Sequence, residues 1–477
     1  MKRLRIVLVN AGRRTQIPQS LSPPLGIMYL ASYLRAKFKA EVRIIDQLLD
    51  NSRNQQLVKK IIDFNPDIVG LSAMIPTAHN LPELTGLIRT ALPQSLILLG
   101  GGYVSSFAEK ALHKTAAHAA VPGEGERAFE EIIRAYFDGG GDLSSIPGIF
   151  WRDSHEDIVS NPGGRLYIED LDSLPFPAYD LIDLPAYWKH QSFSSIIKSR
   201  YASLFSSRGC PYNCIYCHRI FGQKFRFHSA GRIIEEIQYL QKLYHINDVE
   251  FLDDIFNLNH KRVFEFCDLL KKNGMRLKLS FPNGVRTDIL TEQEMLALKE
   301  AGLYFCSFSL ESGSPRIQEL IGKNLDIEKF LKNVELAVSC GIFCNGYSML
   351  GFPTETEAEI NRTIDVVCHS RLHTTSFFTV TPFPNTEVYH HVMQTSPEKL
   401  SGICYDDMEY ATIHCNLSAV PDEMLFSYQR RAHRRFYLNP NRVFRIFRDY
   451  PSPWSLPFIL PVLLSRLTKG LFTAKTG

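Results

Sequence analysis

The sequence lacks any run of eighteen or more uncharged apolar residues, so we expect no helix that spans a membrane. Its net charge of +3 is too small to indicate nucleic-acid binding by itself. Ten cysteines in 477 residues are no disulfide framework, and no signal peptide precedes the first short apolar stretch. We therefore expect a protein of the reducing cytoplasm that binds no nucleic acid.

The first 209 residues contain no cysteine. Three cysteines then fall within eight residues: Cys210, Cys214 and Cys217. Gly209 and Pro211 favour a loop here, because Pro lacks a backbone donor and Gly permits unusual backbone angles. A tight loop can turn three thiolates toward one centre, and thiolates are preferred ligands of iron–sulfur clusters. Three ligands are one short of a protein-ligated [4Fe–4S] cluster, which leaves one iron open. The alternatives are a zinc site that includes His218, or unrelated core thiols.

An aromatic residue, Tyr216, precedes the third cysteine, and with it the loop resembles that of the radical S-adenosylmethionine (SAM) superfamily. The resemblance implies that the open iron chelates the amino and carboxylate groups of SAM. It also implies that an electron from the cluster cleaves SAM to a 5′-deoxyadenosyl radical. An electron donor such as a flavodoxin or a ferredoxin is then expected.

Short apolar strands alternate with helical segments over residues 1–140. The strands are expected at 4–9, 42–45, 67–72, 96–99 and 117–121. This alternation predicts an α/β fold with a doubly wound, Rossmann-like parallel sheet. Ligands of such sheets bind at the carboxyl ends of the strands.

Glycines and other small residues follow three of these strands, and a Pro-Pro-Leu-Gly sequence precedes the first helix. Glycine lets a backbone approach a ligand closely, or simply makes a tight turn. Together the loops resemble the cobalamin-binding domain that precedes many radical SAM domains, most specifically at the Gly-Glu-Gly-Glu loop, 123–126. This resemblance predicts that cobalamin is bound by Pro24, Leu25, Gly26, Ser72, Ala73, Met74, Gly100, Gly101, Gly102, Tyr103, Gly123, Glu124 and Gly125.

One motif of related cobalamin domains is missing. Domains of the methionine synthase type carry Asp-x-His-x-x-Gly, whose histidine ligates cobalt, whereas Asn10-Ala11-Gly12 stands in that region here. Tyr103 occupies a place where relatives often have histidine, and a phenol with a pKa of about 10 is a poor cobalt ligand. We therefore expect that no protein side chain ligates the lower face of the cobalt.

Residues 141–199 are expected to be a connector, similar to the linker of cobalamin-dependent radical SAM enzymes. The segments 148–152 and 157–160 predict a small hairpin. Pro175 and Pro177 exclude a continuous helix further on.

Strands and helices alternate again over residues 200–390. Strands are expected at 202–206, 248–252, 277–281, 304–310, 342–350 and 376–381. Six such units predict the partial (βα)6 barrel of the radical SAM family, with its site at the carboxyl ends of the strands. The family resemblance predicts SAM contacts from Tyr216, Asp253, Asp254, Asn283, Arg286, Glu311, Ser312, Arg316 and Gly351. Each of these alone would equally suit a helix cap or the surface.

The expected roles of these residues follow from their chemistry. Asp253 or Asp254 would accept from the SAM ammonium, and Asn283 and Glu311 would bond its ribose hydroxyls. The SAM carboxylate would pair with Arg286 or Arg316.

Residues 391–477 are expected to form a helical C-terminal region. The segment 422–439 interleaves arginines with aromatic residues, and 454–467 is apolar but broken by Pro457 and Pro461. Such a basic helix with an apolar tail could lie on an anionic membrane surface, or pack as a cap on the barrel. We expect Cys340 and Cys344 to be buried free thiols rather than ligands of a second cluster.

These features predict a cobalamin-dependent radical SAM enzyme. The resemblance implies a C-methyltransferase that acts on an unactivated carbon through the 5′-deoxyadenosyl radical and methylcobalamin. A cyclase or rearrangement enzyme with the same cofactors is the first alternative, and a non-catalytic binding protein the second. A methylthiotransferase is excluded, because its three further cysteines are absent from residues 1–209. The tail favours a lipid-like or other small-molecule substrate.

Overall fold

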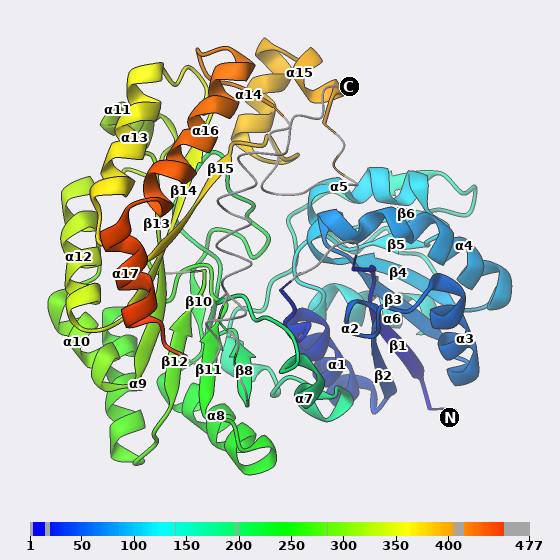
Figure 1. The fold of residues 1–477 in the computed structure, drawn as a ribbon. Coiled ribbons are helices and arrows are strands. Elements are labelled where there is room, and N and C mark those ends of the chain that lie inside the picture. Colours follow the sequence, from blue (N-terminus) through cyan, green and yellow to red (C-terminus); the bar gives the residue numbers. More distant parts are fainter. Residues whose placement is uncertain are drawn as a thin grey trace.

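The computed structural model describes residues 3–14, 20–138, 140–194, 196, 198, 200–283, 285–403, 405 and 415–452. Figure 1 shows two units side by side: an N-terminal sheet with its helices (blue to cyan) and an arc of strands wrapped by helices (green to red). The predicted apolar tail at 454–467 and Cys404 lie outside the described residues.

The N-terminal sheet has the strand order β2-β1-β3-β4-β5-β6-β7. β1 to β5 are parallel, and β6 and β7 are antiparallel. The hairpin predicted in the connector therefore extends this sheet. The strands are β1 (Arg5–Asn10), β2 (Glu41–Asp46), β3 (Ile68–Ser72), β4 (Leu96–Gly100), β5 (Ala119–Ala120), β6 (Phe150–Arg152) and β7 (Ile158–Ser160).

Helices cover both faces of this sheet, so the doubly wound prediction is confirmed (Figure 1). Alternate residues of β1 point to opposite faces. Ile6 and Leu8 pack in the cluster that holds α1 and α6, whereas Val7 and Val9 pack in the cluster that holds α3, α4 and α5. The helices are α1 (Leu25–Phe38), α2 (Gln47–Asp50), α3 (Asn54–Phe64), α4 (Leu81–Ala91), α5 (Gly101–Lys114) and α6 (Glu126–Asp138).

The second unit is the predicted partial barrel. Its six strands are all parallel, in the order β8-β11-β12-β13-β14-β15, so β8 and β15 are the two edges. The strands are β8 (Tyr201–Leu204), β11 (Asp248–Phe251), β12 (Lys278–Phe281), β13 (Leu303–Glu311), β14 (Phe343–Leu350) and β15 (Thr374–Thr379). The intervening helices are α8 (Ala230–Tyr244), α9 (His260–Lys272), α10 (Glu292–Glu300), α11 (Pro315–Leu320), α12 (Ile327–Ser339) and α13 (Glu357–His369).

The predicted C-terminal helix is present as α16, which packs against α13 and β15. Within the described part of the chain, no helix is long and apolar enough to cross a membrane. The remaining helices are α7 (Leu184–Tyr187), α14 (Glu387–Thr395), α15 (Glu398–Ser401), α16 (Asp422–Tyr437) and α17 (Pro440–Asp449), and β9 (Ser207–Arg208) pairs with β10 (Arg226–Phe227).

The two units share one apolar core. A single cluster of buried side chains runs from α1 and α6 into the barrel strands and helices. Hydrogen bonds cross the same boundary: Ser22 Oγ lies 2.7 Å from Ser203 Oγ, and the Tyr29 hydroxyl lies 3.3 Å from His228 Nε2. The N-terminal sheet and the barrel are therefore packed together rather than joined by the connector alone.

Candidate active site

The cysteine loop follows β9 and is held by backbone hydrogen bonds. Cys210 N–H donates to Gly222 O, Cys217 N–H to Cys214 O, and Ile215 N–H to Ile321 O at the end of α11. Gly209 has a φ of +85°, and a Cβ there would lie 2.4 Å from Lys224 O. Only glycine fits this backbone, so the loop predicted from Gly209 and Pro211 is confirmed.

The three loop thiols are free. Desolvation by the surrounding protein raises the pKa of each, and with the nearby Asp254 carboxyl it raises that of Cys217, which is exposed at the surface, to about 12. These thiols are therefore protonated in the metal-free chain at neutral pH. A bound metal centre deprotonates coordinating thiols, because its positive charge outweighs the cost of burial.

Three predicted SAM residues gather beside this loop. Asp254 accepts from the Gly209 N–H, and burial together with Asp253 raises its pKa to about 6. Tyr216 bonds the Cys214 side chain. Glu311, at the end of β13, pairs with Lys323 Nζ at 3.0 Å, and both side chains are largely buried. Lys323 was missed from the sequence, where one lysine in a polar turn after a helix gives no signal.

Asn283 and Gly351 also lie at strand ends of the barrel. Asn283 follows β12, is exposed, and donates through Nδ2 to Leu252 O at 2.9 Å. Gly351 follows β14, and its N–H donates to Glu355 Oε2 at 2.7 Å. Both positions agree with the predicted edge, and their contacts with SAM stay predictions.

Other predicted SAM residues have partners within the protein. Asp253 is buried and accepts from the Ser206 and Ser207 N–H groups at 2.6 and 3.2 Å. Ser312 is buried, and its hydroxyl lies 3.3 Å from Thr363 Oγ1.

The two predicted arginines are also paired. Arg286 forms a two-point ion pair with Asp288, at 2.7 and 3.0 Å, and its guanidinium stacks 3.8 Å above the Tyr212 ring. Arg316 is exposed at the start of α11 and pairs with Glu359 at 2.7 Å. Whether either contacts SAM stays a prediction.

The predicted cobalamin loops meet at the carboxyl edge of the N-terminal sheet. Ala73 N–H donates to Gly100 O at 3.3 Å, and Tyr103 N–H donates to Ala73 O at 3.0 Å. Gly101 has a φ of +89°, and a Cβ there would lie 2.5 Å from Ser72 Oγ. Met74 is 49% exposed at the same edge.

The other predicted cobalamin residues at this edge differ in their exposure to solvent. Pro24 precedes α1, Leu25 is buried and Gly26 is exposed. Tyr103 is buried, with its ring 5.3 Å from that of Phe107. The absence of a protein ligand on the lower face of cobalt stays a prediction.

A buried ion-pair network joins the Gly-Glu-Gly-Glu loop to the cysteine loop. Glu124 lies 2.6 Å from Arg226 and 3.2 Å from Arg208, and also accepts from the Ile168 N–H at 3.0 Å. Glu126 lies 2.8 Å from Arg208. All four charged side chains are nearly inaccessible to water. Burial lowers the pKa of Arg208, but the two glutamates raise it further, so Arg208 stays charged.

Sequence reasoning missed the two arginines. Arg208 directly precedes the cysteine loop and Arg226 follows it, but nothing in the pattern separates them from surface arginines. Glu124, predicted as a cobalamin contact, pairs with both arginines, and its contact with cobalamin stays a prediction.

His218, considered above only as a zinc ligand, links the cysteine loop to the N-terminal sheet. Its Nδ1 lies 3.4 Å from Ser106 Oγ on α5, and its ring centroid lies 4.6 Å from that of Phe383. Burial lowers the pKa of His218 to about 4, so the ring is neutral at neutral pH.

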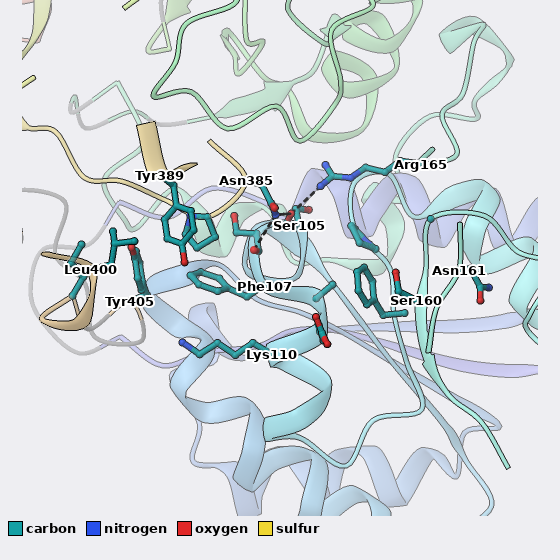
Figure 2. Close-up of a pocket in the computed structure, with 18 of the residues that line it drawn as sticks. Ser105, Phe107, Lys110, Ser160, Asn161, Arg165, Asn385, Tyr389, Leu400 and Tyr405 are labelled. Atoms are coloured by element: carbon teal, nitrogen blue, oxygen red, sulfur yellow. Dashed lines mark hydrogen bonds between the residues drawn. The ribbon is translucent and has the colours of Figure 1, made fainter. Parts of the chain in front are cut away.

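A cavity of about 770 Å³ opens next to this contact (Figure 2). α5 bends at Phe107, whose backbone is not helical. Figure 2 shows Arg165 and Asn385 reaching the Ser105 backbone, where they donate to its carbonyl at 3.0 and 3.3 Å. Aromatic side chains line much of the cavity: Phe107, Phe150, Tyr389 and Tyr405.

Comparisons with known proteins agree with this geometry. The Radical SAM superfamily profile matches residues 204–367, and the B12 binding domain profile matches residues 18–133. A relative named uncharacterized methyltransferase PH0819, from Pyrococcus horikoshii, is 31% identical over 448 residues, covering 92% of this chain and 94% of the relative. The chain belongs to the radical SAM superfamily, in a form that carries a B12-binding domain.

Two further likenesses are more distant. The anaerobic magnesium-protoporphyrin IX monomethyl ester cyclase of Rubrivivax gelatinosus is 24% identical over 434 residues, which cover 90% of this chain and 75% of that protein. The solved structure of the cobalamin-dependent SAM radical enzyme OxsB has a TM-score of 0.73 at 18% identity, covering 98% of this chain and 76% of OxsB. The second likeness supports the same fold.

The residues of this radical SAM protein suit its cofactors, which are a [4Fe–4S] cluster, SAM and cobalamin, as predicted. Within the described residues, no group of three or more His, Cys, Asp or Glu side chains could hold a metal ion. A cluster needs no such convergence, because each thiolate binds a different iron.

The N-terminal edge also suits a large ligand. The backbone at Gly101 leaves no room for a Cβ, and the cavity of about 770 Å³ begins one turn further along α5. The edge thus places tightly packed glycine loops beside open volume, and a bulky cofactor requires such volume.

Proposed function

We propose that this enzyme is a C-methyltransferase that methylates an unactivated carbon of a small molecule. The observation that carries the proposal is the arrangement of one loop with three free thiols against the edge of a cobalamin-type sheet. When bound, the cluster supplies the electron that cleaves SAM, and cobalamin supplies the methyl group.

The chain's own contribution is positioning. Cys210, Cys214 and Cys217 would hold three irons and leave the fourth open. Asp254 and Glu311 would accept hydrogen bonds from SAM, because both carboxyls lie beside the loop. Lys323, paired with Glu311, would balance the charge of that carboxylate.

Cobalamin would lie over the loops that follow β3 and β4, with part of the cofactor reaching into the cavity beside α5. These loops lie close to the cysteine loop. His218 directly follows Cys217, and it bonds Ser106 on α5. A substrate held between the two cofactors would then be enclosed by both units. Such enclosure excludes water from reactive radicals.

The same arrangement serves a cyclase, and the likeness to the Rubrivivax cyclase favours that as the second candidate. The test uses anaerobically reconstituted protein with hydroxocobalamin, SAM labelled in its methyl carbon, and titanium citrate. We expect 5′-deoxyadenosine and labelled methylcobalamin. Formation of 5′-deoxyadenosine without label on cobalamin would favour the cyclase, and the absence of both would favour a binding protein.

The partners follow from this chemistry. A flavodoxin or a ferredoxin would supply electrons, and the basic, apolar C-terminal sequence motivates a lipid-like substrate. Every cysteine among the described residues is free, which supports a reducing, cytoplasmic setting.

A further inference from the structure

The last described helix, α17, buries one arginine and exposes two phenylalanines. Arg442 is 3% exposed and points inward, whereas Phe444 is 66% exposed and Phe447 is 39% exposed. A helix on a soluble surface normally buries its phenylalanines and exposes its arginines. The outward phenylalanines therefore require a reason other than the packing of this helix.

Both terminal nitrogens of the inward arginine donate hydrogen bonds. Arg442 donates to the backbone carbonyls of Cys368, in the last turn of α13, and of Ser370 and Leu372 just beyond it. Its guanidinium lies 3.7 Å from the Phe436 ring centroid. Ile446 is buried beside it. These contacts fix the rotation of α17, so Phe444 and Phe447 cannot turn inward without breaking them.

The most exposed apolar side chains lie at the junction of α16 and α17 and in the first turns of α17. Phe444 and Leu438 are the two most exposed large hydrophobic residues of the described chain, at 66% and 63%. Leu438 lies directly after α16, and α16 contacts α17. We define the α16–α17 surface as Leu438, Phe444 and Phe447 with Arg430 and Arg434.

This surface carries exposed positive charge. Residues 424–448 contain seven arginines, of which Arg442 is buried and Arg435 and Arg448 pair with Asp365 and Asp449. Arg430 and Arg434 precede Leu438 by two turns and one turn of α16, and both are exposed. The sequence beyond Ser452 is rich in apolar residues and also contains no Asp or Glu.

We propose that the α16–α17 surface docks on an anionic lipid bilayer. Apolar side chains would enter the acyl boundary while arginines meet lipid phosphates, which is the composition of interfacial helices. A protein partner would satisfy the phenylalanines, but the exposed Arg430 and Arg434 complement lipid phosphates directly. The proposal is independent of methyl transfer, since it concerns a surface away from the cysteine loop.

The test is flotation of the full holoenzyme with two kinds of vesicle: phosphatidylcholine alone, and an equimolar mixture of phosphatidylcholine and phosphatidylglycerol. We expect binding to the mixed vesicles, weakened by salt. Phe444→Ser with Phe447→Ser should lose this binding. Arg430→Gln with Arg434→Gln should weaken it by on the order of tenfold, because each cation near the surface contributes separately.

Phe137→Ser is the matched control, because Phe137 is 48% exposed on α6 and far from this surface in the sequence. It should bind vesicles as the unaltered protein does, and every variant should retain SAM cleavage. Equal binding to both vesicle types would overturn the role of lipid charge. Unchanged binding by the phenylalanine variant, or a dimer that this variant dissociates, would overturn membrane docking itself.

Discussion

The Glu124 carboxylate lies 2.6 Å from the Arg226 guanidinium, and both side chains are buried between the N-terminal sheet and the barrel. Breaking a buried ion pair by removing one partner leaves an uncompensated charge, which costs about 3–5 kcal/mol. Glu124→Gln should therefore lower the free energy of unfolding by about that amount, and lower the iron content of purified protein. Chemical denaturation and iron analysis measure both.

A matched control for this change is Glu169→Gln. Glu169 pairs with Lys224, close in sequence to Arg226, but both side chains are exposed. Exposed pairs contribute little, so this variant should keep its stability and its iron. Equal losses in the two variants would contradict the role assigned to the buried network.

Cys214→Ala should abolish SAM cleavage, because it removes one of only three cluster ligands. Cobalamin should remain bound, since its predicted contacts lie on the other unit. The measurements are 5′-deoxyadenosine by chromatography and cobalamin by absorption after anaerobic reconstitution. Cys340→Ala serves as the control, because Cys340 is a free thiol at the end of α12. Retained cleavage in Cys214→Ala would contradict the assignment of the cluster.

Gly101→Ala should reduce bound cobalamin and stability together. The new Cβ would lie 2.5 Å from Ser72 Oγ, at a φ that side chains rarely adopt, so the loops after β3 and β4 must separate. The cost should be at least about 1 kcal/mol. Gly86→Ala in α4 meets no atom within 4 Å and should be stabilising by about 0.5–1 kcal/mol. Cobalamin content and thermal unfolding distinguish the two, and normal cobalamin content in Gly101→Ala would argue against this binding edge.

The free energy of unfolding should fall as the pH rises from the ordinary pKa of Glu355 to its pKa in the folded protein. Burial raises the pKa of Glu355 to about 8, from an ordinary value of 4.5. Between these values the folded chain holds a proton that the unfolded chain has released, so the free energy of unfolding decreases by about 1.4 kcal/mol per pH unit. Below the lower value the two states are equally protonated, and above the higher value the loss is complete.

Glu355→Gln removes this titration and still presents an oxygen to the Gly351 and Phe352 N–H groups, which Glu355 now bonds. Denaturation of both proteins from pH 5 to pH 8 gives the comparison. The difference between the two curves should grow with pH. Parallel curves would show that Glu355 is ionised in the folded protein.

Much of the fold was predictable, because the strands are local patterns. Four consecutive apolar residues between polar ones gave β1, and the same reasoning placed every barrel strand close to its position. The cysteine loop was also predictable, since its three ligands and its glycine are neighbours in sequence. Such features need no knowledge of long-range packing.

The partners of charged side chains were not predictable. Glu124 and Arg226 are 102 residues apart, and only the packing of the two units brings them together. Arg316 shows the same limit: its long side chain turns to Glu359, which is 43 residues away in the sequence. Asp253 and Asp254 are adjacent, yet one turns to the Ser206 backbone and the other to Gly209. Sequence position alone cannot give these directions.

The open edges of the barrel limit which domains can be exchanged between related enzymes. Because β8 and β15 do not pair, the N-terminal unit encloses part of the cysteine loop. At the interface between the two units, Glu124 and Glu126 neutralise arginines of the barrel unit. A chimera that takes its B12 domain from one relative and its barrel from another would leave buried charges without partners at this interface. Exchange of substrate scope by domain grafting would succeed only if the acidic pair and both arginines travel together.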